Sequence, residues 1–521
     1  MTRRRRFEAR LAALAAGQPG LLQAGLRGVE KECLRVTPDG HVARTGHPVA
    51  LGSALTNHYI TTDYSEALIE FITPPQRSTP ATLDFLTDIH QFAWPAIGTE
   101  LFWPLSMPCR LRGEDDIPIA RYGSANVARM KSVYRRGLGF RYGRYMQAIA
   151  GVHFNYSLPG DFWPAYAELE RASCDVGALK SAAYLDVVRN VRRMDWLLLY
   201  LFGASPAVCR CFLPGGGPGL EPLDGATWFA PHATSLRMSD LGYKNASQAG
   251  LWISANSLEE YIGDLTRAIH TPQPEFERIG LKVDGQWRQL NSNQLQIENE
   301  YYSTIRPKRT ALSGERPTSA LRRGGIEYLE LRALDLDPFS PTGINVRELL
   351  FSEVFLVFCL LWDSPAISQA EHADIDFNHR AVARRGREPG LVLRRQGREV
   401  AMQAWAQEIL QAMAAVAALL DGGAPAGYQA AVHECAALFA TPEATPSARV
   451  LRELRSGGQS LVEFGLGLAT GYRQHFLALE NAANSHYQLL ETEAQASLDR
   501  QCWIEEHDTL SFDEYLAAYY A

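Results

Sequence analysis

The sequence predicts an α+β fold, in which helices surround an antiparallel sheet and a mainly helical part follows. Three observations support this prediction: short segments that alternate apolar and polar residues, Asp-Gly turns between such segments, and a last third rich in Ala, Leu, Glu and Gln. The chain has 521 residues, 46% of them apolar, which is ample for a large core. We expect one unit over 1–521, with a sheet-containing core at 20–365 and a mainly helical portion at 366–521.

The strands are predicted from alternation, because successive side chains of a strand point to opposite faces. Residues 149–159 and 324–335 alternate apolar and polar positions over their length. Residues 32–45 and 280–291 have the pattern of hairpins, with Asp-Gly at each turn. One apolar and one polar face are typical of an antiparallel sheet whose polar face meets water or a ligand.

The helices are predicted from spacing and from end signals. Residues 180–203 have helical spacing and stop at Gly203. Residues 348–365 are the most hydrophobic stretch, but Glu353 interrupts it and leaves a run too short to cross a bilayer. We therefore expect a buried core helix there, and mostly helix over 399–500.

Charge and cysteine content narrow the class of protein. The formal net charge of -7 and the pI of about 6.0 provide no general attraction to nucleic acid or to anionic lipid. We interpret the basic run Arg3–Arg6 as a solvated terminal tail. Eight scattered cysteines without a CxxC pair indicate reduced thiols rather than a zinc site or a disulfide framework. The sequence thus predicts a cytoplasmic protein with no nucleic-acid or membrane partner.

Acidic residues recur in four segments among apolar neighbours. The segment RGVEKECLR places Glu30 and Glu32 on one face of a strand, because they are two residues apart. The other three segments carry Asp63, Glu66 and Glu70 in TTDYSEALIEFITPP, Glu330 and Arg332 in GIEYLELR, and Glu298, Glu300, Arg306, Lys308 and Arg309 in QIENEYYSTIRPKR.

Two interpretations of these acids are open. Any one of them could be paired on a solvated surface, as Glu30 and Glu32 would be on an edge strand beside Lys31 and its basic neighbours. However, an unpaired buried carboxylate costs several kcal/mol, and converging carboxylates can be held by a hard divalent cation. Oxygen ligands suit Mg²⁺ or Mn²⁺, and the nearby Arg332, Arg306 and Lys308 suit phosphate oxygens. Four segments together favour a metal and nucleotide site.

Nine segments carry a family resemblance. They include GVEKECLRV, GHPVALGSALTNHYITTDYSEALIEFITP, WPLSMPC, YGSANVARMKSVYRRGL, ATSLRMSDLGY and NSNQLQIENEYYSTIRPKR. These segments closely resemble the proteobacterial glutamate–cysteine ligase family, most densely over 20–345. The resemblance implies a curved sheet funnel related to the glutamine synthetase catalytic core. It also implies the first step of glutathione biosynthesis, in which L-glutamate, L-cysteine and ATP give γ-glutamylcysteine, ADP and phosphate.

The resemblance also implies roles for individual residues. The implied magnesium ligands are Glu30, Glu32, Asp63, Glu70 and Glu330, with Mn²⁺ as an alternative ion. Arg135 and Arg332 would hold the transferring phosphoryl group, Arg237 would contact glutamate, and Arg306 and Lys308 would bind ATP. The cysteine pocket would consist of Tyr64, Tyr134, Leu138, Tyr243 and Tyr302. Tyr64 stands where the family is expected to have Phe.

Other implications concern partners and alternatives. The resemblance implies a monomer that is inhibited by glutathione, which contains the same γ-glutamylcysteine unit. Three alternatives stay open: another magnesium-dependent glutamate–amine ligase with this core, a two-metal phosphate-ester hydrolase, and a nucleotide-binding regulator without turnover. We interpret His153 as a hydrogen-bonded sheet residue, and we predict no site in 366–521.

Overall fold

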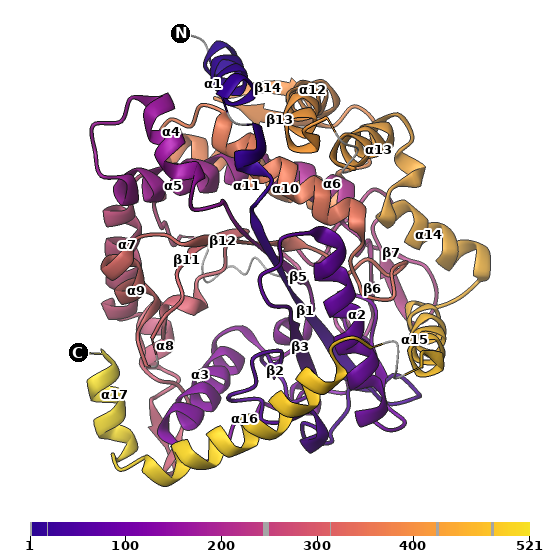
Figure 1. Ribbon diagram of the computed structural model, residues 1–521. Coiled ribbons are helices and arrows are strands. Elements are labelled where there is room, and N and C mark those ends of the chain that lie inside the picture. Colours follow the sequence, from indigo (N-terminus) through magenta and orange to yellow (C-terminus); the bar gives the residue numbers. More distant parts are fainter. Residues whose placement is uncertain are drawn as a thin grey trace.

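A seven-stranded antiparallel sheet lies at the centre of the computed structural model (Figure 1). Its order is β11-β12-β5-β1-β3-β2, with β4 paired to the end of β1. The strands are β1 (Leu26–Val36), β2 (Ile60–Thr62), β3 (Leu68–Ile72), β4 (Leu101–Phe102), β5 (Val152–Ser157), β11 (Ile305–Lys308) and β12 (Tyr328–Leu334). The structure describes residues 3–17, 19–242, 250–312, 314–423, 427–480 and 484–520. The predicted α+β class with an antiparallel sheet is confirmed.

The register of this sheet gathers polar residues on one face. Directly paired residues of antiparallel strands point the same way. The polar pairs are Glu32 with Glu70, Glu30 with His153, Asn155 with Glu330, and Glu330 with Arg306. They form one row across β3, β1, β5, β12 and β11, so acids from distant parts of the sequence share one surface of the sheet.

The opposite face of the sheet is mostly apolar and packs against helices. These are α2 (Thr79–Ala96), α5 (Val176–Met194), α6 (Trp196–Phe202) and α10 (Val346–Leu361), and α11 (Gln369–Arg385) packs in turn on α5 and α6. In Figure 1, α5, α6, α10 and α11 lie above the sheet, and α3 (Asn126–Tyr142) and α16 (Tyr487–His507) lie below it.

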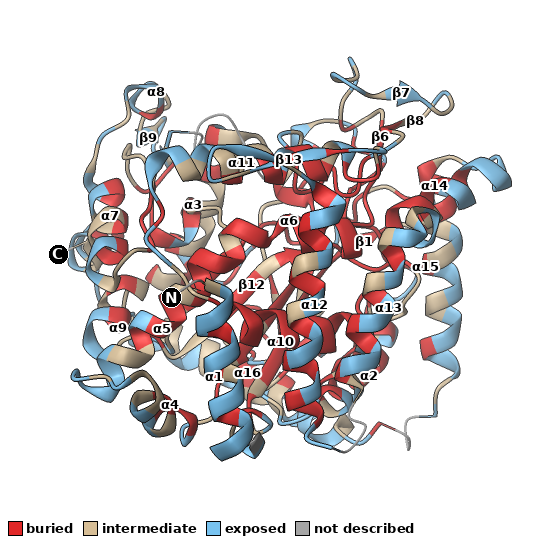
Figure 2. Cartoon of the chain, turned by 90° about the horizontal axis from the view of Figure 1, so that it is seen from above, coloured by how far each residue is buried: buried red, intermediate tan, exposed pale blue. Residues whose placement is uncertain are grey.

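The predicted core helix at 348–365 is confirmed as α10, which is buried along its length (Figure 2). The carboxylate of Glu353, which interrupts the apolar stretch, is completely buried. It accepts hydrogen bonds from Arg27 Nη2 at 2.6 Å and from the Tyr428 hydroxyl at 3.0 Å. Glu353 therefore forms an ion pair with Arg27 inside the core.

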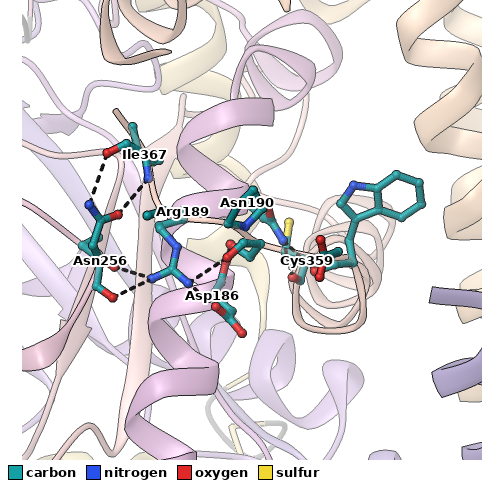
Figure 3. Close-up of polar contacts among 12 residues, drawn as sticks. Asp186, Arg189, Asn190, Asn256, Cys359 and Ile367 are labelled. Carbon is teal, nitrogen blue, oxygen red and sulfur yellow. Dashed lines mark hydrogen bonds and ion pairs between the residues drawn. The ribbon is translucent and has the colours of Figure 1, made fainter. Parts of the chain in front are cut away.

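The predicted helix at 180–203 is divided into α5 and α6 at Asp195 and ends at Gly203, as expected. Asn190 of α5 donates from Nδ2 to the carbonyl oxygens of Cys359 at 2.8 Å and Trp362 at 2.9 Å (Figure 3). These carbonyls lie at the end of α10, where a helix leaves such groups without internal partners. The bonds therefore fix α5 against α10 behind the sheet.

One of the two predicted hairpins is confirmed, and the other forms only in part. The segment 280–291 forms β9 (Lys282–Val283) and β10 (Gln286–Trp287), with positive φ at the Asp284-Gly285 turn. The segment 32–45 makes its turn, but its return strand is a single bridge between Val36 and Val42. The end of β1 also pairs with β4.

The remaining elements surround this core. They are α1 (Arg3–Gly17), α4 (Phe162–Glu170), β6 (Ala207–Cys209), β7 (Glu221–Pro222), β8 (Thr227–Phe229), α7 (Leu258–His270), α8 (Pro274–Glu277) and α9 (Pro317–Gly324). The run Arg3–Arg6 is largely exposed, as expected, but it is helical and does not form a loose tail. These residues begin α1, and Arg6 forms ion pairs with Glu170 at 2.9 Å and Asp363 at 3.0 Å.

The carboxyl-terminal part is mostly helical. It holds α11, the hairpin β13 (Val392–Arg395) and β14 (Arg398–Ala401), α12 (Met402–Asp421), α13 (Tyr428–Ala440), α14 (Pro446–Gly457), α15 (Leu461–Ala478), α16 and α17 (Phe512–Tyr520). One cluster of buried apolar side chains extends from Phe7 to Leu490. No described helix combines the length and the apolar character that a bilayer crossing requires.

Candidate active site

His153 stands at the centre of the acidic row. Its Nδ1 atom lies 3.1 Å from Glu30 Oε2 and 3.7 Å from Glu330 Oε1, and its Nε2 atom lies 3.7 Å from Glu32 Oε1. Asn155 donates to Glu30 Oε1 at 2.9 Å. Three carboxylates from β1 and β12 thus surround one imidazole, which agrees with the interpretation of His153 as a hydrogen-bonded sheet residue.

The surroundings shift the pKa values of these acids in different directions. Burial opposes ionisation of Glu330, but Lys308 Nζ at 3.5 Å and Arg332 Nη1 at 3.0 Å outweigh it and hold the pKa of Glu330 well below its usual range. Burial raises the pKa of Glu32. Burial and then the carboxylates of Glu30 and Asp63 raise the pKa of Glu70 well above its usual range. The positive charges of the protein therefore favour ionisation of Glu330 but do not offset the burial of Glu32 and Glu70.

The donor set fits a hard divalent cation. One oxygen each of Glu30 and Glu70 and one nitrogen of His153 lie within 4.8 Å of one another. Glu330 Oε2 is buried without a hydrogen-bond partner among the described residues. Carboxylate oxygens dominate the set, as Mg²⁺ and Mn²⁺ prefer.

The structure brings the five predicted ligands together. Glu30 and Glu70 belong to the group around His153, Glu32 and Glu330 each lie 3.7 Å from its ring nitrogens, and Asp63 lines the adjoining cavity with Glu32. We call Glu30, Glu32, Asp63, Glu70 and Glu330 the acidic cluster.

The alternative of a solvated edge strand is wrong for Glu30 and Glu32. Strand β1 lies between β5 and β3, and its basic residues point to the opposite face. There Arg27 pairs with Glu353, Lys31 Nζ lies 2.7 Å from His90 Nε2, and Arg35 pairs with Glu100 at 2.6 Å. The neighbouring basic side chains are therefore used in the core and do not neutralise the acids.

A small cavity of about 80 Å³ adjoins the acidic cluster. Eight of its lining residues were predicted as site residues: Glu32, Asp63, Tyr64, Tyr134, Arg135, Leu138, Tyr302 and Arg332. The other four are Met146, Gln147, Ile149 and Asn299. Tyr243, the remaining predicted pocket residue, lies outside the described residues.

Helix α3 supplies one wall of the small cavity. Tyr134, Arg135 and Leu138 fall on one side of it, because residues four apart share a helix face. Arg135 donates from Nε to the carbonyl oxygen of Asp63, and its guanidinium lies 4.7 Å from the centre of the Tyr122 ring. The arginine thus ties α3 to the loop that carries one of the acids.

Tyr64 reaches the same cavity from that loop. Only 1% of the residue is exposed, and its hydroxyl has no hydrogen-bond partner in the part of the chain that the structure describes. A methyl group at Gly139 of α3 would lie 2.6 Å from this hydroxyl. The close approach of Tyr64 to α3 therefore requires glycine at position 139.

A second cavity, of about 340 Å³, lies on the other side of Asn299, which borders both cavities. Arg306, Lys308, Tyr261, Tyr328 and Thr310 are among its lining residues. Lys308 also approaches Glu330, so it connects this cavity to the acidic cluster. Arg306 Nη2 donates to the carbonyl oxygen of Asn299 at 2.8 Å. The two predicted ATP-binding residues thus share one cavity beside the acids.

Arg237 lies behind this surface. It is buried, donates from Nη2 to the carbonyl oxygen of Arg332 at 3.2 Å, and faces Asp335 at 3.6 Å.

The acids of QIENEYY do not join the acidic cluster. Glu300 pairs with Arg141 at 2.8 Å, and Glu298 accepts from the Thr318 hydroxyl at 2.5 Å. A short 3-10 turn over Glu298–Glu300 directs them into the protein instead.

Some residues of the site were not predicted. His153 and Asn155 could have been found, because they occupy the polar face of an alternating strand beside an acidic one. Gln147 and Asn299 carry no such signal, since they come from irregular segments placed by the fold.

Comparisons with known proteins identify the family of the chain. The glutamate–cysteine ligase family model matches residues 11–382. Glutamate–cysteine ligases of Azotobacter vinelandii and Pseudomonas aeruginosa are each 49% identical, over 99% and 98% of this chain and 98% and 97% of theirs. A crystal structure of a glutamate–cysteine ligase from Francisella tularensis in complex with AMP has a TM-score of 0.90 and 37% identity, over 95% of this chain and 97% of that one. The chain therefore belongs to the glutamate–cysteine ligase family.

Proposed function

We infer that this protein joins L-glutamate to L-cysteine at the expense of ATP, forming γ-glutamylcysteine, ADP and phosphate. The observation that supports this most is the acidic cluster between a small cavity and a larger one, each lined by predicted substrate residues. The family membership of the chain, matched over almost its whole length, indicates the same reaction.

The reaction has two steps. A carboxylate is a poor electrophile, so the γ-carboxylate of glutamate first takes the γ-phosphoryl group of ATP and becomes an acyl phosphate, while ADP leaves. The amine of cysteine then attacks the acyl carbon, phosphate leaves with the bonding electrons, and the nitrogen loses a proton. Phosphoryl transfer needs positioning and charge neutralisation more than covalent help from the protein.

The two cavities suit the two ends of this chemistry. The second cavity, with Tyr261 and Tyr328 in its walls and Lys308 beside Glu330, would take the nucleotide. Arg135 and Arg332 line the small cavity and would hold the transferring phosphoryl group, because guanidinium forks match phosphate oxygens.

The small cavity suits a small amino acid. Its walls of Tyr64, Tyr134, Leu138 and Tyr302 are apolar with hydroxyl tips, as a thiol side chain requires. Tyr243 remains a further predicted member of this pocket. Arg237, which donates to the carbonyl oxygen of Arg332, remains the residue expected to contact glutamate.

The five acids of the acidic cluster would hold Mg²⁺, with Mn²⁺ as a substitute. When bound, the ion neutralises phosphate charge during transfer. His153 and Asn155 hold Glu30 by hydrogen bonds to both of its carboxylate oxygens and so fix its orientation.

Three further expectations accompany this function. The eight cysteines are all free thiols, which fits a cytoplasmic location. Glutathione should inhibit, because it contains the γ-glutamylcysteine unit and can occupy the glutamate and cysteine positions. We also expect the enzyme to act as a monomer, which size-exclusion chromatography with light scattering would check.

A single assay tests the function. The purified protein is incubated with ATP, Mg²⁺, glutamate and cysteine, each omitted in turn, while ADP release and γ-glutamylcysteine are measured. Product should form only in the complete mixture. A preference for ammonia or a polyamine over cysteine would indicate a different amine ligase. Phosphate release from esters without glutamate would indicate a hydrolase, and ATP binding without turnover would indicate a regulator.

A further inference from the structure

Glu300 is a completely buried carboxylate with three donors. Its Oε1 atom accepts from Arg141 Nη1 at 2.8 Å and from the Tyr142 hydroxyl at 2.7 Å. Its Oε2 atom accepts from the backbone N–H of Gln296 at 2.7 Å. A buried charge is tolerated only in a well-formed set of partners, so these groups are held in one arrangement.

These bonds join the end of α3 to the segment 289–302. Besides Glu300, Arg141 donates from Nε to Gln289 Oε1 at 3.0 Å and from Nη2 to the carbonyl oxygen of Asn291 at 2.6 Å. The side chain of Gln296 returns to the middle of α3, where Nε2 donates to the carbonyl oxygen of Tyr134 at 3.2 Å. The segment is therefore attached to α3 at two levels.

Glycine at position 137 permits the attachment of the Gln296 side chain to the middle of α3. A methyl group on Gly137 of α3 would lie 2.2 Å from Gln296 Oε1. Gln296 Oε1 also accepts from the backbone N–H of Leu290 at 3.0 Å. The packing of this side chain against α3 is thus specific.

The neighbours of Glu300 line both cavities. Asn299 borders both of them, and Tyr302 lines the small one. The Tyr142 ring, whose hydroxyl binds Glu300, meets the Tyr302 ring edge to face with centres 6.1 Å apart. The Tyr302 hydroxyl in turn accepts from Gln147 Nε2 at 3.0 Å. A displacement at Glu300 would therefore reach a wall of the small cavity through one ring.

Helix α17 closes this unit from outside. The Tyr520 hydroxyl donates to the carbonyl oxygen of Gln296 at 2.7 Å and accepts from Asn291 Nδ2 at 3.0 Å. Phe512 and Leu516 form a separate apolar cluster with side chains of α3 and of the 289–302 segment: Met130, Val133, Leu290 and Ile297. The carboxyl-terminal helix, for which no site was predicted, thus lies directly behind the small cavity.

We propose that Glu300, paired with Arg141, is a positioning residue for the amino acid bound in the small cavity, and that α17 completes the same unit. The proposal rests on the proposed function, in which Tyr134 and Tyr302 contact cysteine. Glu300 itself does not line either cavity. Its loss should therefore weaken the binding of cysteine more than it slows phosphoryl transfer.

The chain offers a matched control in Glu353. This carboxylate is equally buried and also binds one arginine and one tyrosine, Arg27 at 2.6 Å and Tyr428 at 3.0 Å. It lies on the helix-covered side of the sheet, and none of these three residues lines either cavity. Glu353→Gln removes the same kind of buried charge without disturbing the small cavity.

The experiment compares Glu300→Gln with Glu353→Gln in the full chain. Each substrate is varied while the others are saturating. In Glu300→Gln the KM for cysteine should rise by roughly ten- to a hundred-fold, because a small displacement of a pocket wall is costly. The KM for ATP should rise less than the KM for cysteine, because among the described residues Glu300 reaches the second cavity only through the backbone of Asn299 and Tyr301, and kcat should change by no more than about three-fold. In Glu353→Gln all three parameters should stay within about three-fold of wild type.

Hydrogen exchange provides a readout that does not need turnover. Amides of 295–302 should exchange faster in Glu300→Gln than in Glu353→Gln. If Glu300→Gln does not fold, Tyr142→Phe and Tyr520→Phe, which each remove one hydroxyl, should raise the KM for cysteine by about three- to ten-fold. Equal exchange, or a rise in the KM for cysteine no larger than in Glu353→Gln, would overturn the proposal. A wild-type protein without ligase activity would instead overturn the proposed function, and with it the positioning role, whereas the exchange comparison would then show only whether Glu300 holds the 295–302 segment.

Discussion

Replacing Glu70 by glutamine should stabilise the metal-free protein. A carboxylate oxygen of Glu70 lies within 4.8 Å of one of Glu30. Two negative charges at that distance repel by about 3.5 kcal/mol at an effective dielectric constant of about 20. Glutamine keeps the shape of the side chain and removes one charge. The free energy of unfolding should therefore rise by up to about 3 kcal/mol, and most at alkaline pH, where the raised pKa of Glu70 no longer keeps it protonated.

Urea unfolding at about pH 8.5 measures this effect, in EDTA and in excess MgCl₂. Magnesium should stabilise the wild type, by about 2.7 kcal/mol when the ion is at about one hundred times its Kd. Glu70→Gln should gain much less and should lose most of its ligase activity. Glu348→Gln is the control, because Glu348 is a buried acid on α10 whose pKa is also raised by burial, away from the acidic cluster. Its response to magnesium should match the wild type.

Two results would refute this reasoning. A Glu70→Gln protein that is less stable than wild type in EDTA would mean that the carboxylates are not in conflict. Equal stabilisation of both proteins by magnesium would mean that Glu70 does not take part in holding the ion.

Three further outcomes are expected. Tyr64→Phe removes a buried hydroxyl without a partner among the described residues, so denaturant unfolding should show a gain of about 1 kcal/mol. Gly151→Ala should lower kcat/KM more than about ten-fold, because its methyl group would lie 2.0 Å from Arg237 Nη2. Burial and then Arg35 lower the pKa of His47 from 6.5 to about 4. The contribution of neutral His47 to the free energy of unfolding is complete above pH 6.5. It should fall by about 3 kcal/mol by pH 4, because unfolding then lets the imidazole take up a proton, and this loss should be absent in His47→Gln.

Much of the sheet and part of the site could be predicted because their signals are local. Alternation places Glu30 and Glu32 on one face of β1 and His153 and Asn155 on one face of β5, whatever lies beside them. The family resemblance implied roles for eight of the residues that line the small cavity. The partner of each acidic side chain was harder to predict from the sequence. Glu300 and Glu70 both belong to the acidic segments of the sequence, yet Glu300 pairs with Arg141 in the interior.

The sequence by itself determined which faces are polar, where helices replace strands, and which acids lack a basic partner on their own face. Only the tertiary structure decided that Glu70 lies opposite Glu32, that Glu330 of β12 approaches His153 of the adjacent strand β5, and that α17 packs against α3 and the 289–302 segment. The physical reason is that side-chain periodicity is a property of a few consecutive residues. Strand order, register and the packing of distant helices follow from the burial of the whole core.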